Sequence, residues 1–327
     1  MNSLENPLVS IIIPFYKNLT YLDECLKHCL DLDYPRYEIL VVSNYPLEWS
    51  YEKVKVIIID EKGQGHKKNA GLSHASGEIC AFIDDDAYPD QNWIKNAIKY
   101  FCDPDIVAVG GPGVTPPNDN LMQQAGGLIY SLPIGSGKIS LRYDSAKKTT
   151  KVDELPGYNL FIRTFFLKEI GGINVKYRSG EDSILSNRIV NLGKKFTYAD
   201  DVVVYHHRRP LFRSHLKQVS TYALHRGYFA KKYPETSAKL SYVLPSTSLI
   251  IIAVWFLFGI LIPVFLLPLV ALIASYLILC FVSASIKSKN LKLSSLVCVG
   301  IPLTHLVYAF YFIKGLLTKE LGSRPSY

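Results

Sequence analysis

The longest uncharged stretch of the chain sets the first limit on its fold. Residues 240–286 contain no Asp, Glu, Lys, Arg or His over 47 positions. A helix needs only about 20 apolar residues to cross a bilayer, so this stretch has room for two crossings. Pro263 and Pro268 lie near its middle, where a tight hairpin would turn. A further stretch, residues 293–313, carries His305 as its one ionisable side chain of these five types, and we expect a third membrane helix there. The alternative is a very apolar soluble helical domain.

Basic residues gather just before this stretch, in residues 206–235, and contribute to a net charge of +8. The positive-inside rule then predicts that residues 1–240 lie on the cytoplasmic face of a cell membrane. We expect the basic segment to contact anionic membrane lipids, and no nucleic-acid-binding motif accompanies it. Three crossings would place Lys319 and Arg324 outside, against the same rule, unless the last segment is re-entrant or lies in the interface.

The region before residue 210 alternates apolar β-branched runs with helical patterns. The runs are VSIIIP, YEILVVS, VKVIIID, GEICAFI and IVAVG, with a last strand expected in KKFTYADDVVVYHHRR. This alternation predicts an α/β fold with a mostly parallel sheet. Glycines in residues 118–150 predict irregular or mobile structure there. We expect three regions: an α/β domain over 1–210, a basic juxtamembrane helical segment over 211–240, and a membrane region over 241–327 with two to three transmembrane helices.

Three adjacent carboxylates, Asp84, Asp85 and Asp86, directly follow the buried run GEICAFI. Ligands of open parallel sheets bind beyond the carboxyl ends of the strands, so the ends of the first, second and fourth runs are expected to share one crevice. Vicinal carboxylates there can hold Mg²⁺ or Mn²⁺, which would neutralise a diphosphate. The alternative is a solvated acidic turn that caps the next helix.

Several motifs, taken in order, give the chain a resemblance to a known family. They are VSIIIPFYKN, YEILVVSN, GQGHKKNAGLSHASGEICAFIDDDAYP, LPGYNLFIRTFFLKEIGGIN and SGEDSILSNRIVNLGKKFTYADDVVVYHHRR. Over residues 7–210 these resemble the family-2 glycosyltransferases, which have the GT-A nucleotide-sugar-binding fold. The basic segment and C-terminal helices are similar to those of membrane-anchored members that build bacterial or archaeal surface glycans.

The resemblance implies a nucleotide-sugar site and a divalent metal, Mg or Mn. Asp84 to Asp86 match the DXD-type motif, in which Asp86, together with Asp84, would hold the metal. Ser43 and Asn44 stand where relatives usually have an acidic residue that recognises the base, which leaves the identity of the donor nucleotide open. The residues matched to nucleotide-sugar binding are Pro14, Phe15, Tyr16, Ser43, Asn44, Lys68, Asp84, Asp85, His207 and Arg208.

The resemblance also implies the catalytic and acceptor residues. Glu181 and Asp182 match the ED motif, whose Asp is the usual general base of an inverting transfer; an acidic helix N-terminus is the simpler interpretation of the same residues. Gly157, Tyr158 and Asn159 match the segment that lines the acceptor side, where a plain strand-entry turn is the alternative.

The basic residues after the last expected strand have three interpretations. His207 and Arg208 match positions that can contact the diphosphate. Arg208 and Arg209 can instead lie beside lipid headgroups. His206 and His207 as metal ligands are the third option.

Together these features predict a glycosyltransferase that moves one sugar from a nucleotide-sugar to a polyprenyl-linked saccharide. The QxxRW motif of processive synthases does not follow the ED pair, which favours a single addition over polymerisation. Direct transfer to polyprenyl phosphate and a non-catalytic membrane scaffold with the same fold are the alternatives. A nicotinamide-dependent oxidoreductase is disfavoured because the GxGxxG spacing is missing.

Overall fold

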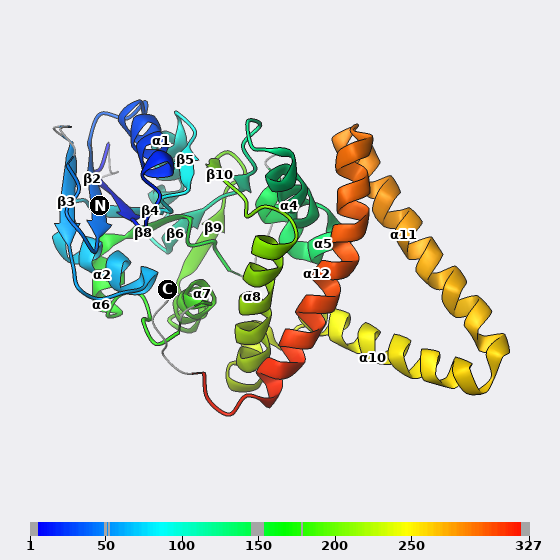
Figure 1. Ribbon diagram of the computed structural model, residues 1–327. Coiled ribbons are helices and arrows are strands. Elements are labelled where there is room, and N and C mark those ends of the chain that lie inside the picture. Colours follow the sequence, from blue (N-terminus) through cyan, green and yellow to red (C-terminus); the bar gives the residue numbers. More distant parts are fainter. Residues whose placement is uncertain (1–5, 49–50, 52, 145–153, 178, 322–327) are drawn as a thin grey trace. The chain divides into compact units, whose positions relative to one another are not determined.

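A computed structural model describes residues 6–48, 51, 53–144, 154–177 and 179–321. This part of the chain divides into two compact units, whose elements are labelled in Figure 1. The first contains the described residues of 1–114 and 144–206, and the second contains residues 115–143 and 207–321. The division predicted from the sequence, with boundaries after residues 210 and 240, stays a prediction.

The first unit is built on a seven-stranded sheet with the order β3-β2-β1-β4-β8-β6-β9. Its strands are β1 (Val9–Pro14), β2 (Tyr37–Ser43), β3 (Val54–Ile58), β4 (Ile79–Ile83), β6 (Ile106–Gly110), β8 (Asn159–Arg163) and β9 (Lys195–Tyr198). Only β8 runs antiparallel to its neighbours β4 and β6. A small second sheet joins β5 (Ala87–Pro89), β10 (Val204–His206) and β7 (Gly113–Val114). The predicted α/β fold with a mostly parallel sheet is confirmed.

Helices cover both faces of the large sheet because successive side chains of a strand point to opposite faces. Ile11 and Ile13 of β1 belong to a core cluster with Leu22 of α1. Ile12 belongs to the opposite cluster with Leu72 of α2. The helices of this unit are α1 (Leu19–Leu30), α2 (Gln64–His74), α3 (Trp93–Ile98), η1 (Lys99–Cys102), α6 (Thr164–Glu169) and α7 (Glu181–Asn191). A sheet buried on both faces explains why its strands read as continuous apolar runs.

The second unit is helical. Its elements are α4 (Leu121–Ser131), α5 (Pro133–Ser136), η2 (Gly137–Tyr143), α8 (Arg213–Lys232), α9 (Pro234–Ser237), α10 (Leu240–Leu261), η3 (Pro263–Phe265), α11 (Leu266–Ser288) and α12 (Leu291–Leu317). The three helical segments 240–261, 263–288 and 291–317 are long and apolar enough to cross a membrane. The predicted C-terminal apolar helices are therefore confirmed, and their number among the described residues is three.

The structure corrects two local predictions. Residues 121–131 form α4 where irregular structure was expected, because Asn120 and Gln123 make a capping box that starts a helix. Residues 145–150 of the same prediction lie outside the described part. The single strand expected over residues 194–209 is two strands, β9 and β10, which belong to different sheets.

Candidate active site

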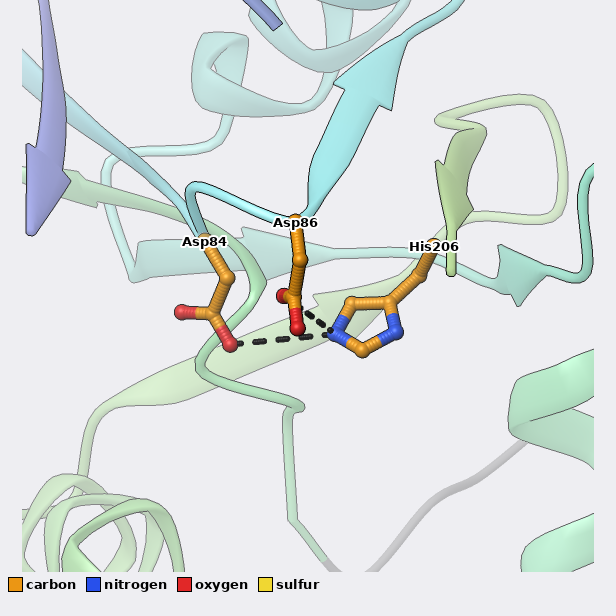
Figure 2. Close-up of side chains that lie close together, drawn as sticks. All are labelled: Asp84, Asp86 and His206. Atoms are coloured by element: carbon orange, nitrogen blue, oxygen red, sulfur yellow. Dashed lines mark ion pairs between the residues drawn. The ribbon is translucent and has the colours of Figure 1, made fainter. Parts of the chain in front are cut away.

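Asp84, Asp86 and His206 lie together beyond the carboxyl end of β4 (Figure 2). The Nε2 atom of His206 is 3.4 Å from Asp86 Oδ1 and 3.8 Å from Asp84 Oδ2. One potential ligand atom from each of the three residues falls within 4.8 Å of the others. His206 reaches the carboxylates because β10 pairs antiparallel with β5, which sets His206 opposite Ala87. Two carboxylates and an imidazole form a donor set suited to a hard or borderline divalent cation such as Mn²⁺.

Asp85 faces a different group from its two neighbours. Its Oδ2 atom accepts a hydrogen bond of 2.8 Å from the backbone N–H of Tyr16. Lys67 donates to the carbonyl of Phe15, while burial lowers the pKa of Lys67 and the charge of Asp85 counteracts this. Asp85 and Lys67 thus fix the loop that follows β1.

This loop contains the predicted base-lining residues, which the structure places in different environments. Pro14 and Phe15 are buried, whereas the Tyr16 side chain is 45% exposed. Tyr45 donates from its hydroxyl to the Tyr16 carbonyl at 2.9 Å, and its ring packs edge-on against Phe15. Tyr16 and Tyr45 therefore offer exposed aromatic surface beside the loop, and Tyr45 was missed from the sequence.

Ser43 and Asn44 make local contacts at the end of β2. Ser43 Oγ accepts the N–H of Tyr45 at 3.1 Å. Asn44 donates from Nδ2 to the carbonyls of Ile59 at 2.8 Å and Glu61 at 3.0 Å. These bonds order the turns after β2 and β3, and the role of both residues in base recognition stays a prediction.

A charged group lies where α2 meets the start of α7 and consists of buried Lys68 and half-buried Glu181 and Asp182. Lys68 Nζ lies 3.9 Å from Glu181 Oε1. Burial alone would lower the pKa of Lys68, but the charges of Asp182, Glu181 and Asp84 outweigh this and raise it, so Lys68 stays cationic. Burial, together with the charge of Asp182, raises the pKa of Glu181 to about 7.

Asp182 is held by the backbone that precedes β8. Its Oδ2 atom accepts the N–H of Gly157 at 2.9 Å. Burial raises the pKa of Asp182, while the Lys68 charge and the Gly157 hydrogen bond act in the opposite direction. A Cβ atom at position 157 would lie 2.2 Å from Asp182 Oδ1 and 2.8 Å from Lys68 Nζ. A larger residue here would force these two side chains to move, because the chain passes directly against them. The motif alone did not reveal this contact.

Tyr158 and Asn159, the other predicted acceptor residues, point to different surroundings. The ring of Tyr158 lies 4.8 Å from that of His206, centroid to centroid. Asn159 is fully buried. It accepts from Trp93 Nε1 at 2.9 Å and donates to the carbonyls of Val202 at 2.7 Å and Pro112 at 3.1 Å. These bonds join α3, β8 and the segments beside β7 and β10, and an acceptor contact by Asn159 stays a prediction.

Replacing Asn159 with alanine is expected to lower the free energy of unfolding by about 3 kcal/mol, because it leaves buried polar partners unsatisfied. Denaturant unfolding of the protein in detergent measures this loss. Asn92 is a matched control because it is exposed and makes no side-chain cap at α3; its alanine variant is expected to differ by less than about 0.5 kcal/mol. Equal effects at both positions would contradict a structural role for Asn159.

His207 and Arg208 belong to the second unit, although they directly follow His206 in the chain. His207 Nδ1 contacts Asp119 Oδ1, and the N–H of Arg208 donates to Asp119 Oδ2 at 3.3 Å. The Arg208 guanidinium lies over the ring of Tyr143, 4.6 Å from its centroid. Their predicted contact with a diphosphate stays a prediction.

From the sequence, His206 was a metal-ligand candidate only in the third interpretation, together with His207. Successive side chains of a strand point to opposite faces, and this alternation distinguishes His206 from His207. His206 is the last residue of β10, and its side chain points toward Asp86. The alternation shows that His206 faces Asp86 only once the pairing of β10 with β5 is known.

A mostly parallel α/β sheet with an acidic cluster beyond β4 is the arrangement expected of the GT-A fold. Residues 10–171 match the family described as glycosyl transferase family 2, and the chain belongs to it. The glycosyltransferase AglE of Haloferax volcanii is 28% identical over an alignment of 223 residues that covers 62% of this chain and 68% of that protein.

Two further similarities agree with this assignment. A Methanococcus voltae protein is 23% identical over an alignment of 243 residues that covers 68% of this chain and 74% of that protein. It is named dolichyl N-acetyl-alpha-D-glucosaminyl phosphate 3-beta-D-2,3-diacetamido-2,3-dideoxy-beta-D-glucuronosyltransferase. Among solved structures, a mannosyltransferase from Pyrobaculum calidifontis in complex with GDP-Man and Mn²⁺ aligns with a TM-score of 0.57 and 19% identity, covering 98% of this chain and 90% of that one. The latter likeness concerns the fold.

Proposed function

We propose that this glycosyltransferase moves one sugar from a nucleotide-sugar to a lipid-linked saccharide, with inversion at the anomeric carbon and with Mg²⁺ or Mn²⁺ as cofactor. The observation that carries the proposal is that the first unit contains two separate clusters of side chains with carboxylates. Asp84 and Asp86 gather with His206 beyond β4, and Asp182 is fixed separately between Gly157 and Lys68. The first group has metal-ligand chemistry, and the second has the chemistry of a base.

Asp84, Asp86 and His206 would hold the cation. When bound, it supplies positive charge that offsets the negative charge of a departing nucleoside diphosphate. Asp85 has a supporting role in this proposal, since it fixes the loop that carries Tyr16 through the backbone bond described above. Tyr16 and Tyr45 offer the aromatic surface against which a nucleotide base can stack.

Asp182 is proposed as the general base. The acceptor hydroxyl gives its proton to the Asp182 carboxylate while its oxygen forms a bond to the anomeric carbon. The bond between that carbon and the diphosphate oxygen breaks on the opposite face, and the electron pair leaves with the nucleoside diphosphate. The buried cation of Lys68 favours the ionised form of Asp182, which the reaction requires.

A lipid-linked saccharide is the proposed acceptor for two reasons. The Methanococcus voltae relative is named for a dolichyl-phosphate-linked sugar acceptor. This chain also carries three helices apolar enough to enter a membrane, which suits a substrate that is confined to a bilayer. We place the first unit on the cytoplasmic face, where nucleotide-sugars are made.

The transfer assay that tests this proposal uses the purified full chain, Mn²⁺ and a panel of radiolabelled UDP-, GDP- and dTDP-sugars. One set of reactions receives polyprenyl phosphate, and the other receives a polyprenyl-linked saccharide. We expect label in the saccharide-bearing lipid only, with the anomeric configuration opposite to that of the donor. Label on bare polyprenyl phosphate would instead support that alternative acceptor, and no transfer from any donor would favour the non-catalytic scaffold.

Replacing His206 with alanine is expected to weaken Mn²⁺ binding by at least about tenfold, because a metal site loses a ligand. Titration of the nucleotide-free protein, followed by the electron paramagnetic resonance of free Mn²⁺, measures this change. His207 provides the matched control since it is adjacent in sequence but contacts Asp119. A variant at His206 that binds Mn²⁺ as the wild type does would remove this residue from the site.

The transfer rate is expected to fall at acidic pH as Asp182 takes up a proton. Burial raises the pKa of Asp182, so this loss is expected at a higher pH than for an ordinary aspartate, whose pKa is about 3.9. Removing the nearby cation in Lys68→Met should move the acid limb of kcat/KM upward by about one pH unit or more. Lys62→Met, at an exposed lysine, is the control. An acid limb that stays in place in Lys68→Met would contradict this coupling.

A further inference from the structure

Helix α12 differs from the other two apolar helices in how much protein covers it. In its most apolar 18-residue window 33% of α12 is buried, against 11% for residues 240–261 and 11% for residues 263–288. Val297, Ile301 and Phe312 of α12 have no exposed surface. A helix that crosses a bilayer beside only α10 and α11 would resemble them in burial, so α12 has a different environment.

Much of the protein that covers α12 is α8, which runs beside it in the same direction (Figure 1). Near the start of α8, His215 Nε2 and Thr304 Oγ1 are 2.9 Å apart. Near its end, a Cβ atom at Gly227 would lie 2.0 Å from the Phe312 carbonyl oxygen. A Cβ atom at Gly315 would likewise lie 2.2 Å from the Leu224 carbonyl oxygen. These contacts extend over α12 from residue 304 to residue 315, with the two backbones touching at glycine.

Helix α8 has the composition of a helix in water or at a membrane surface. It carries five Arg or Lys residues spread from its first residue to its last: Arg213, Lys217, Arg226, Lys231 and Lys232. All but Arg226 are exposed. Charged side chains inside the hydrocarbon layer are costly unless they face a polar interior. Because α8 lies against α12 from residue 304 to residue 315, this part of α12 cannot enter the hydrocarbon layer without taking these charges with it.

The outer face of α12 forms a single apolar stripe. Val299, Leu306, Phe310 and Leu317 are 53%, 49%, 61% and 77% exposed. Their spacing of seven, four and seven residues puts all four on one side of an α-helix. Lys287, Lys289 and Lys292 gather where α11 ends and α12 begins. An apolar stripe that starts beside a cluster of lysines matches the boundary between lipid chains and anionic headgroups.

We propose that α12 lies along the surface of the bilayer, with this stripe in the lipid and its opposite face on α8, and that only α10 and α11 cross. The bilayer is thus the partner of the exposed face. Two crossings return the chain to the side from which it entered. Lys319 then lies on the same side as Lys239, as the positive-inside rule requires, whereas three crossings would separate them; Arg324 lies outside the described residues. The proposal does not rest on the function of the first unit.

Protease protection of the full chain in a bacterial host tests the number of crossings. One epitope is added at the N-terminus and another at the C-terminus, each through a cleavage site for one protease, and the same site is inserted after Ile262, at the turn between α10 and α11. In intact spheroplasts we expect cleavage at the inserted site while both epitopes are protected. In inside-out vesicles we expect both epitopes to be removed. Removal of only the C-terminal epitope in spheroplasts would mean three crossings and would overturn the proposal.

Depth measurements test the position of α12 itself. Spin labels are attached to cysteines introduced at Val299, Leu306, Phe310 and Leu317, after Cys102→Ser and Cys298→Ser remove the two native cysteines that are not buried. In phosphatidylcholine and phosphatidylglycerol vesicles we expect similar, shallow depths at all four positions.

Exposed positions of α11 with the same seven-residue spacing, Leu272, Leu279 and Ile286, are the matched set and should differ in depth, since α11 crosses. Depths along α12 that rise to a maximum at the bilayer centre would indicate a crossing or re-entrant helix. That result would refute the proposal even if the two epitopes lie on one side.

Discussion

Asp182→Asn is expected to lower kcat by about 10²–10⁴-fold, the contribution of a positioned general base. The amide has nearly the size of the carboxylate and can still accept the Gly157 N–H through its oxygen. It cannot take a proton from an acceptor hydroxyl. The nucleotide-sugar is bound by other residues in this account, so its dissociation constant should change by less than about threefold.

Measuring kcat and donor binding on the same preparation separates loss of the base from loss of folding. Asp105→Asn is the control, because Asp105 is an exposed carboxylate that pairs with Lys195; its variant should keep the wild-type kcat. Undiminished transfer by Asp182→Asn would mean that another group takes the proton.

Gly157→Ala is expected to reduce kcat by about 10²-fold, because displacing a catalytic group by about 1 Å can cost that much. The added methyl group would lie 2.2 Å from Asp182 Oδ1, which is too close for the carboxylate to keep its place. Movement of the carboxylate would also disturb the hydrogen bond that Asp182 accepts from the Gly157 N–H.

A double-mutant cycle tests whether the effect passes through Asp182. If it does, Gly157→Ala combined with Asp182→Asn should be no slower than Asp182→Asn alone, because the displaced group has already lost its function. Strictly multiplicative losses in the double variant would contradict this explanation and indicate general damage to the fold. The thermal midpoint of each variant in detergent provides the control for folding.

Most strands of the large sheet could be predicted because they are buried on both faces, but the antiparallel strand β8 was not among the expected runs. Runs such as VSIIIP and YEILVVS follow one another with helical segments between them, and short parallel crossovers place β1, β2 and β4 side by side. The carboxyl ends of parallel neighbouring strands lie at one edge of a sheet, so the sequence was sufficient to predict that Asp84 and Asp86 lie at that edge. In this part of the chain local pattern and tertiary structure agree.

Helix α4 escaped prediction because glycine is a poor helix former. Gly126 and Gly127 lie inside it, where tertiary packing outweighs propensity. A Cβ atom at Gly127 would lie 1.9 Å from Thr115 Oγ1, and one at Gly126 would lie 2.7 Å from the Arg209 carbonyl oxygen. These glycines permit close contact between segments, information that a count of helix formers does not contain.

The position of His206 beside Asp84 and Asp86 depends on pairing between distant segments of the chain. Position 206 meets position 87 through the β5–β10 ladder, and nothing near HHRR in the sequence specifies that register. The same holds for Gly157, whose motif suggested a turn or an acceptor contact but gave no sign that it touches Asp182 and Lys68. Residues that act through non-local contacts are thus the part of the candidate site that required a structure.

In the proposed mechanism Asp84, Asp86 and His206 hold a divalent cation against the diphosphate of a nucleotide-sugar. Isothermal titration of the full chain in detergent with UDP, GDP, CDP and dTDP, each with and without Mn²⁺, measures whether nucleotide binding needs the metal. We expect that one nucleotide binds only with Mn²⁺, that Asp86→Ala abolishes this binding, and that Asp105→Ala preserves it. Binding that is equally tight without metal, or that survives in Asp86→Ala, would mean that these residues do not hold a cation at the diphosphate.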